Sequence, residues 1–167
     1  EVFRQGLSQS NSSLMSVAAS MERLQTDVAL YQRFPHFHVK TQIEANLPAT
    51  RGEPALVEKA LSNLVAYAAQ LSGQGEVLLS LSQDNDKWLL ISLSGTAFEG
   101  TNAPTEKLLD ESRQFLDKMA AGLSPEGANK NLTGLVLARL IVEHFGGSLG
   151  IPGGDAPGFI VRLPAAM

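Results

Sequence analysis

The sequence predicts an α+β fold, a two-layer sandwich of a mixed β-sheet and a layer of helices, with an amphipathic helix at the N-terminal end. Segments with apolar residues at every third or fourth position are separated by shorter segments of alternating or continuous apolar residues. Most of the strand-like segments are joined in pairs by short polar or glycine-rich turns, which are typical of antiparallel hairpins. A chain of 167 residues, 44% of them hydrophobic, suffices for one such domain.

The first element predicted is a long amphipathic helix over residues 8–31, which contain neither Gly nor Pro. Its apolar residues have the spacing of one helical face: Leu14, Val17, Met21, Leu24, Val28 and Tyr31. Such a stripe serves either as a dimer interface or as the side of a helix packed on its own domain. The apolar spacing alone leaves both uses open.

A half-buried strand follows at residues 37–43, where apolar and polar side chains alternate. Residues 46–54, "NLPATRGEP", read as a turn. Pro54 then suits the first turn of a second helix over residues 53–71. The apolar stripe of that helix is Val57, Leu61, Leu64, Val65, Ala68 and Leu71.

Two apolar runs within residues 76–95 flank the polar turn "QDNDK", and this pattern predicts a β-hairpin. After a polar loop over residues 96–105, apolar spacing favours a third helix over residues 106–123.

The irregular segment "SPEGANKN" leads to a fourth helix over residues 133–145, with Gly134 at its start and Gly146 as its C-terminal stop. The strings "SLGI" and "FIVRLP", joined by the turn "PGGDAPG", predict a closing hairpin.

Composition excludes several classes of function. The net charge of −4 and the pI of about 5.3 provide no basic field for nucleic acid, so no nucleic-acid partner is expected. The absence of cysteine excludes disulfides, thiolate catalysis and cysteine zinc sites. No apolar run approaches the roughly 18 residues of a membrane span. We expect a cytoplasmic piece of a longer protein, whose parent could be membrane-anchored.

The sequence marks no catalytic or metal-binding residue. His36 and His38 share one face of a strand by the two-residue period, but no Asp, Glu or Cys stands nearby at ligand spacing, so we expect both on the solvent face. The chain has no "GxSxG" nucleophile motif.

Two strings carry a resemblance to a known family. "ALSNLVAYAAQLS" resembles the N-box of bacterial sensor histidine kinases, and "TGLVLARLIVEHFGGSLGI" followed by "GFIVRLP" resembles the end of their catalytic, ATP-binding domain. The resemblance implies the Bergerat or GHKL ATPase fold for residues 35–167. Residues 1–34 then resemble the end of the helical hairpin through which these kinases dimerise. The resemblance therefore favours the dimer interface for the apolar stripe, and a homodimer formed through residues 8–31 is expected. His144 matches a structural position of the family, and no histidine has the surroundings of its phosphoacceptor.

In the N-box register, Asn63 occupies the first asparagine position, whereas the second, which holds magnesium in the family, falls on Tyr67. A phenol is a poor neutral ligand for Mg²⁺, which prefers compact, hard oxygens. The basic position that follows falls on Gln70.

The family's "DxGxG" motif falls on residues 93–97. Leu93 replaces the aspartate that accepts a hydrogen bond from adenine in the family, Gly95 is retained, and Ala97 replaces the second glycine. Leu93 cannot accept a hydrogen bond, so this means of discriminating adenine from other groups is removed.

The family's "GxGLGL" motif, which opens a helix towards phosphate, reads "LTGLVL" here. Only Gly134 is retained, while Leu132 and Val136 add side chains where glycines would let the phosphates approach. Lys130 lies in what would be the lid over ATP and could contact phosphate; we expect a solvated loop residue.

These losses favour a non-catalytic module of two-component or phosphorelay signalling, a degenerate kinase domain with no catalytic residue, metal ligand or cofactor. Its vestigial nucleotide site would comprise Asn63, Tyr67, Gln70, Leu93, Gly95, Ala97, Lys130, Gly134 and Val136. The resemblance implies a response regulator receiver, a phosphotransfer domain or a cognate histidine kinase as the partner. One alternative is a histidine kinase domain that binds ATP and Mg²⁺ in an altered site, and another is a pocket for a less charged ligand.

Overall fold

The computed structural model describes residues 13–26, 32–72, 74–99, 104–122, 131–152 and 158–166. Its strands are β1 (Ser13–Met15), β2 (His36–Ile43), β3 (Thr50–Gly52), β4 (Gln74–Asp84), β5 (Trp88–Ser94), β6 (Ser148–Gly150) and β7 (Phe159–Pro164). Its helices are α2 (Val17–Gln25), α4 (Pro54–Ser72), the 3-10 helix η1 (Thr96–Phe98), α5 (Glu106–Ala120) and α6 (Asn131–His144).

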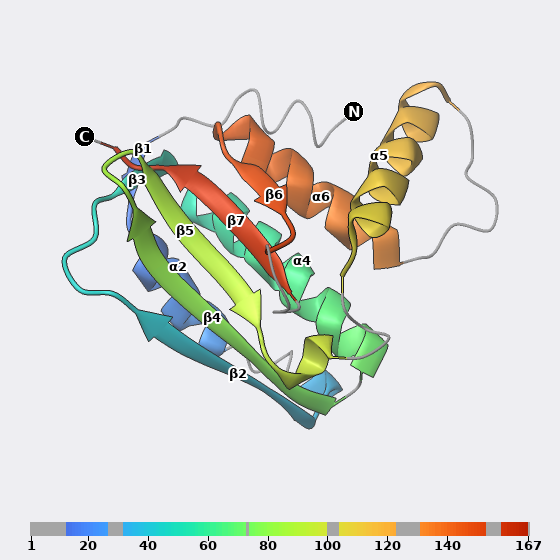
Figure 1. Ribbon diagram of the computed structural model, residues 1–167, viewed down its shortest axis with the longest axis horizontal. Coiled ribbons are helices and arrows are strands. Elements are labelled where there is room, and N and C mark those ends of the chain that lie inside the picture. Colours follow the sequence, from blue (N-terminus) through green and yellow to red (C-terminus); the bar gives the residue numbers. More distant parts are fainter. Residues whose placement is uncertain are drawn as a thin grey trace.

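The main sheet has five strands in the order β2-β4-β5-β7-β6. Strands β2 and β4 are parallel, and every other neighbouring pair is antiparallel. In Figure 1 the helices α4 and α6 lie behind this sheet, and α5 stands at its side. The predicted α+β sandwich of a mixed sheet and a helical layer is therefore confirmed.

Alternation along the strands separates the two faces of the sheet, as a period of two requires. One set of side chains is buried under the helices: Phe37, Val39, Val77, Leu79, Leu81, Leu89, Ile91, Leu93, Phe159, Val161 and Leu163. The opposite face carries partly exposed serines on the paired strands β4 and β5, such as Ser80 opposite Ser92. The core therefore lies between one face of the sheet and the helical layer.

Helix α4 runs along the middle of the core, as its apolar stripe predicted. Leu61, Leu64 and Val65 are fully buried on it, and Leu135, Ala138 and Ile141 are buried on the adjacent helix α6. The hairpin of β4 and β5, the closing hairpin of β6 and β7 and the third helix also form where the sequence predicted them. On β2, His36 and His38 are exposed, as expected, beside the buried Phe37 and Val39.

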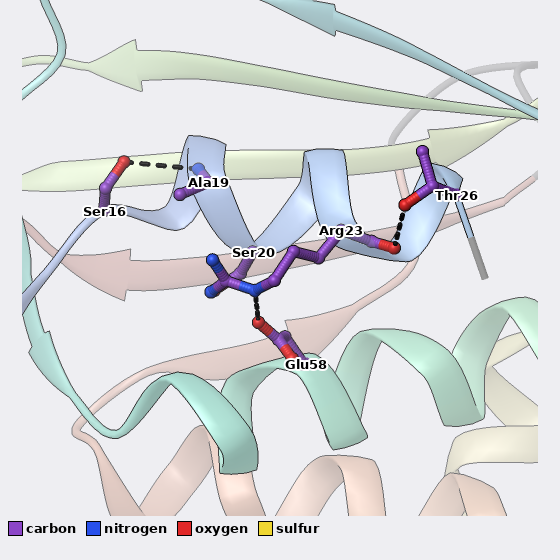
Figure 2. A network of polar contacts seen from close by, with 6 residues as sticks. All are labelled: Ser16, Ala19, Ser20, Arg23, Thr26 and Glu58. Carbon is purple, nitrogen blue, oxygen red and sulfur yellow. Dashed lines mark hydrogen bonds and ion pairs between the residues drawn. The ribbon is translucent and has the colours of Figure 1, made fainter.

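The prediction of one long helix over residues 8–31 is wrong. Ser13–Met15 form a strand that pairs with β3, and α2 begins only at Val17. Ser16 caps α2, because its Oγ accepts a hydrogen bond from the backbone N–H of Ala19 at 3.3 Å (Figure 2). Residues 8–12 and 27–31 lie outside the described part of the chain.

The second missed element is β3, which lies within the segment predicted to be a turn. Thr50 is buried there, and its hydroxyl donates a hydrogen bond of 2.6 Å to the carbonyl of Pro164 at the end of β7. The pairing of β3 with β1 joins residues more than thirty positions apart, and local pattern does not reveal such a partner.

The apolar stripe of the first helix lies inside its own domain. Val17, Met21 and Leu24 are buried in the same core as α4, whereas Leu14 on β1 is 63% exposed. Of the two uses considered for the stripe, the described residues thus favour packing on the chain's own domain. Both a homodimer through residues 8–31 and a domain boundary at residue 34 stay predictions.

Candidate functional site

The residues expected around a nucleotide come together at one end of the sheet. Asn63 and Tyr67 lie on α4, Leu93 at the end of β5, Ala97 on η1, and Gly134 and Val136 on α6. Helix α4 contacts both α6 and η1, which brings these three segments next to one another (Figure 1). The motif positions on these elements are therefore neighbours in space, whereas Lys130 lies outside the described residues and Gln70 is exposed on α4.

An aromatic cluster occupies the position of the second N-box asparagine. The ring of Tyr67, only 6% exposed, packs edge to face on Phe159, with 5.9 Å between the ring centroids. Phe98 also packs edge to face on Phe159, with 5.8 Å between the ring centroids. Aromatic pairs in this geometry add stability beyond the apolar area that they bury. Tyr67 thus belongs to the core of the domain.

The phenol of Tyr67 is held in its neutral form. Burial raises its pKa above the usual value of 10.0 because a phenolate would lose its hydration, and the nearby negative charge of Glu111 on α5 raises the pKa further. The phenol therefore stays neutral, and a neutral phenol is a poor ligand for Mg²⁺, which prefers compact, hard oxygens.

The segment that follows β5 is buried in apolar surroundings. Leu93 is fully buried, and Ala97 and Phe98 on η1 are buried as well. Because Leu93 carries no polar side-chain atom, the position that accepts a hydrogen bond from adenine in the family offers no acceptor here.

Gly95 has a packing role that requires no ligand. Its φ angle is 120°, and a Cβ at this position would lie 2.3 Å from the carbonyl oxygen of Glu76 on β4. Only glycine allows the two backbones to approach so closely in this conformation. The retention of Gly95 therefore follows from the sheet itself, and it does not by itself indicate a nucleotide.

Helix α6 begins at Asn131, two residues before the predicted start, so Gly134 is the fourth residue of the helix and not its opening. Leu132 and Val136, which replace glycines of the family, are both buried. Both side chains thus pack inside the domain, whereas Thr133 between them is exposed.

Asn63 is the polar exception in this region. Its side-chain Nδ2 is buried and has no hydrogen-bond partner among the described residues. A Cβ added to Gly134 would lie 3.7 Å from the Cβ of Asn63, an ordinary contact. Packing between the described residues therefore does not require glycine at position 134, and a buried N–H without a partner costs free energy.

One side-chain hydrogen bond attaches α5 to α6 beside this region. The guanidinium of Arg139 on α6 donates a hydrogen bond of 3.2 Å to the carbonyl of Leu109 on α5, and it also pairs with Glu143 at 3.2 Å. The buried hydroxyl of Ser112 donates to the same carbonyl at 2.6 Å. The Arg139 bond thus ties the first half of α5 to α6, whereas the Ser112 bond lies within α5 and the Glu143 pair within α6.

The remaining histidine is not part of this region: His144 at the end of α6 is exposed and packs edge to face on the ring of Phe145.

Among the described residues, no group of three or more His, Cys, Asp or Glu side chains could hold a metal ion. None of the described helices is long and apolar enough to cross a membrane.

The described residues do not fit a nucleotide with Mg²⁺ held as in the family. In the motif register, Tyr67 stands at the position of the family's metal ligand and Leu93 at that of its adenine acceptor. Both side chains are buried, as is Val136. Sequence reasoning missed Phe159 and Glu111, which lie near Tyr67, and Phe98, which packs on Phe159. The pattern "GFIV" after a glycine-rich turn marked Phe159 as a buried strand residue, but nothing in it indicated contact with α4.

Comparison with known proteins places this geometry in context. No protein-family model matches the chain. The chain is 27% identical over 112 residues to the adaptive-response sensory kinase SasA of Prochlorococcus marinus strain SARG, which covers 66% of this chain and 28% of that protein. It is 28% identical over 112 residues to the SasA of Synechococcus sp. strain CC9311, with the same shares covered. The chain thus spans less than a third of the length of these relatives.

Solved structures share the architecture over nearly the whole chain. The catalytic domain of histidine kinase ThkA matches with a TM-score of 0.69 and 15% identity, covering 93% of this chain and 97% of that one. The chain has the fold of a histidine kinase catalytic domain. The mycobacterial sensor histidine kinase MprB has this catalytic-domain fold with a TM-score of 0.63 and 14% identity, over 93% of this chain and 98% of that chain. The resemblance inferred from the sequence is therefore confirmed.

Proposed function

We propose that this histidine kinase-like domain is a non-catalytic binding or regulatory module of a two-component or phosphorelay system, located in the cytoplasm. The observation that carries the proposal is the aromatic cluster of Tyr67, Phe159 and Phe98, which stands where the family holds its magnesium ligand. Side chains from α4, β5 and α6 that would contact a nucleotide are part of the core instead.

Such a module would act by contact. A partner that binds one conformation of a larger assembly better than another shifts the balance between them, and no phosphoryl transfer is needed. The family resemblance makes a response regulator receiver, a phosphotransfer domain or a cognate histidine kinase the partner to test. Pairwise pull-down of the domain with each of these, taken from the same genome, would identify which one binds.

The decisive experiment is a calorimetric titration of the domain with ATP and Mg²⁺, with a non-hydrolysable analogue in a parallel run. We expect no heat of binding and no change of melting temperature at millimolar nucleotide, because a ligand that binds the native state raises the melting temperature. A histidine kinase catalytic domain with intact nucleotide motifs serves as the positive control. Micromolar binding by the present domain would overturn the proposal.

A second candidate function is an ATP-binding histidine kinase domain with an altered site. The observation that favours it is the unpaired, buried Nδ2 of Asn63 beside Gly134, where packing does not require glycine. If the titration detects binding, Asn63→Ala should abolish it, whereas Gln42→Ala on the exposed side of β2 should leave it unchanged. Equal binding by the two variants would exclude Asn63 from the site.

A further inference from the structure

A polar groove lies between α2 and α4, on residues that take no part in the candidate nucleotide site. Its volume is about 390 Å³, and it is lined by Arg23, Leu24, Ala55, Glu58, Lys59 and Ser62. The four residues from α4 are spaced by three or four positions, which places them on one face of that helix. Leu24 is buried and forms an apolar part of the lining.

The guanidinium of Arg23 is oriented at this groove by two neighbours. Its Nε pairs with the carboxylate of Glu58 on α4, and one terminal nitrogen donates to the hydroxyl of Ser20 at 3.2 Å (Figure 2). Ser20 is fully buried, so it forms a fixed anchor. The guanidinium has five N–H donors in a rigid fork, and the others have no partner among the described residues. Half of the Arg23 side chain is exposed, which leaves those donors accessible.

Lys59 adds a second cation. It lines the same groove, its side chain is exposed, and it forms no ion pair with any described residue. The groove thus combines two cations with a single carboxylate, Glu58, which is already paired with Arg23. The hydroxyl of Ser62 is a further donor on the same helix face. These groups together favour an anionic ligand, because hydrogen bonds from a cation to a carboxylate are stronger than those between neutral groups.

The shape of the groove favours a short segment of chain. From Ala55 to Ser62 the α4 face rises by roughly 10 Å, at about 1.5 Å per residue. An extended peptide covers that distance with about three residues, at roughly 3.3 Å each. We propose that the groove between α2 and α4 binds an acidic peptide segment of a protein partner, whose carboxylates contact Arg23 and Lys59. This inference rests on the proposed function as a docking module, and it names the surface used.

The test is an NMR titration of the domain, without nucleotide, with the peptide Gly-Ser-Glu-Glu-Glu-Ser-Gly. The peptide in which glutamine replaces glutamate serves as the neutral control, and inorganic phosphate and acetate serve as free anions. We expect saturable amide shifts confined to residues 20–26 and 55–62 for the glutamate peptide, and weaker binding at high salt. Binding by the glutamine peptide that is equally tight, or shifts centred elsewhere, would overturn the proposal. Phosphate or acetate binding as tightly as the peptide would do the same.

Charge variants locate the contact. Lys59→Gln should weaken peptide binding by about fivefold, the upper range for one exposed ion pair. Lys59→Glu should weaken it further, and Lys107→Glu, an exposed lysine on α5, should leave it unchanged. Arg23→Ala also removes the contacts to Glu58 and Ser20, so its folding is checked by thermal melting; Lys59 has no such contacts and keeps the test valid. Peptide binding unaffected by Lys59→Glu would refute the site, whatever the nucleotide titration finds.

Discussion

Replacement of Tyr67 by alanine tests the idea that this side chain is structural. A buried aromatic side chain removes about 150–250 Å² from water. At about 25 cal/mol per Å² this amounts to roughly 4–6 kcal/mol, an upper bound because the unfolded chain already buries part of that area. Alanine retains a fraction of the burial but leaves a cavity beside Phe159, and large-to-alanine changes in cores cost about 3–5 kcal/mol.

We therefore expect Tyr67→Ala to lower the free energy of unfolding by about 3–5 kcal/mol, a large part of the roughly 5–15 kcal/mol typical of a domain. The assay is urea denaturation followed by circular dichroism, with the midpoint compared at an unchanged slope. Tyr67→Phe is the matched control, since it keeps the ring and its contact with Phe159. A cost below about 1 kcal/mol for Tyr67→Ala would place the ring outside a packed core and refute the reasoning.

Two further predictions concern pH and the backbone. Because the pKa of Tyr67 is raised in the folded state, the unfolded chain releases this proton first as the pH rises. The stability of the wild type relative to Tyr67→Phe should thus be constant below about pH 10 and fall as the pH rises through the folded pKa, measured by urea midpoints at successive pH values; parallel curves would contradict it. Gly158 has a φ angle of 148°, and a Cβ there would lie 1.8 Å from the carbonyl oxygen of Leu93. Gly158→Ala should therefore lower the melting temperature strongly, whereas alanine at Gly122, which has open space around it but also a positive φ angle, should cost much less; equal losses would contradict the steric argument.

Most secondary-structure elements could be predicted because their signals are local. The three-and-four spacing of Val57, Leu61 and Leu64 requires only a helix with one buried face, and the alternation around Phe37 and Val39 requires only a sheet with one. Motif order added the family fold, because "ALSNLVAYAAQLS" and the closing "GFIVRLP" hold the same relative places in histidine kinase catalytic domains. The motif positions also gave a predicted place for the nucleotide site, which stays a prediction.

The tertiary structure decided what depends on contacts between remote segments. Residues 13–15, predicted to be helical, form β1 instead. This strand pairs with β3, whose residues lie more than thirty positions away in the sequence. The contact of Tyr67 with Phe159 joins α4 to β7, and the groove at Arg23 needs Glu58 from a different helix. The sequence by itself determined which residue types stand at the family's motif positions, since the register of the motifs is enough for that. Which of these side chains are buried, and against which neighbours, depended on the packing of the whole chain, because burial is a property of all the neighbours together.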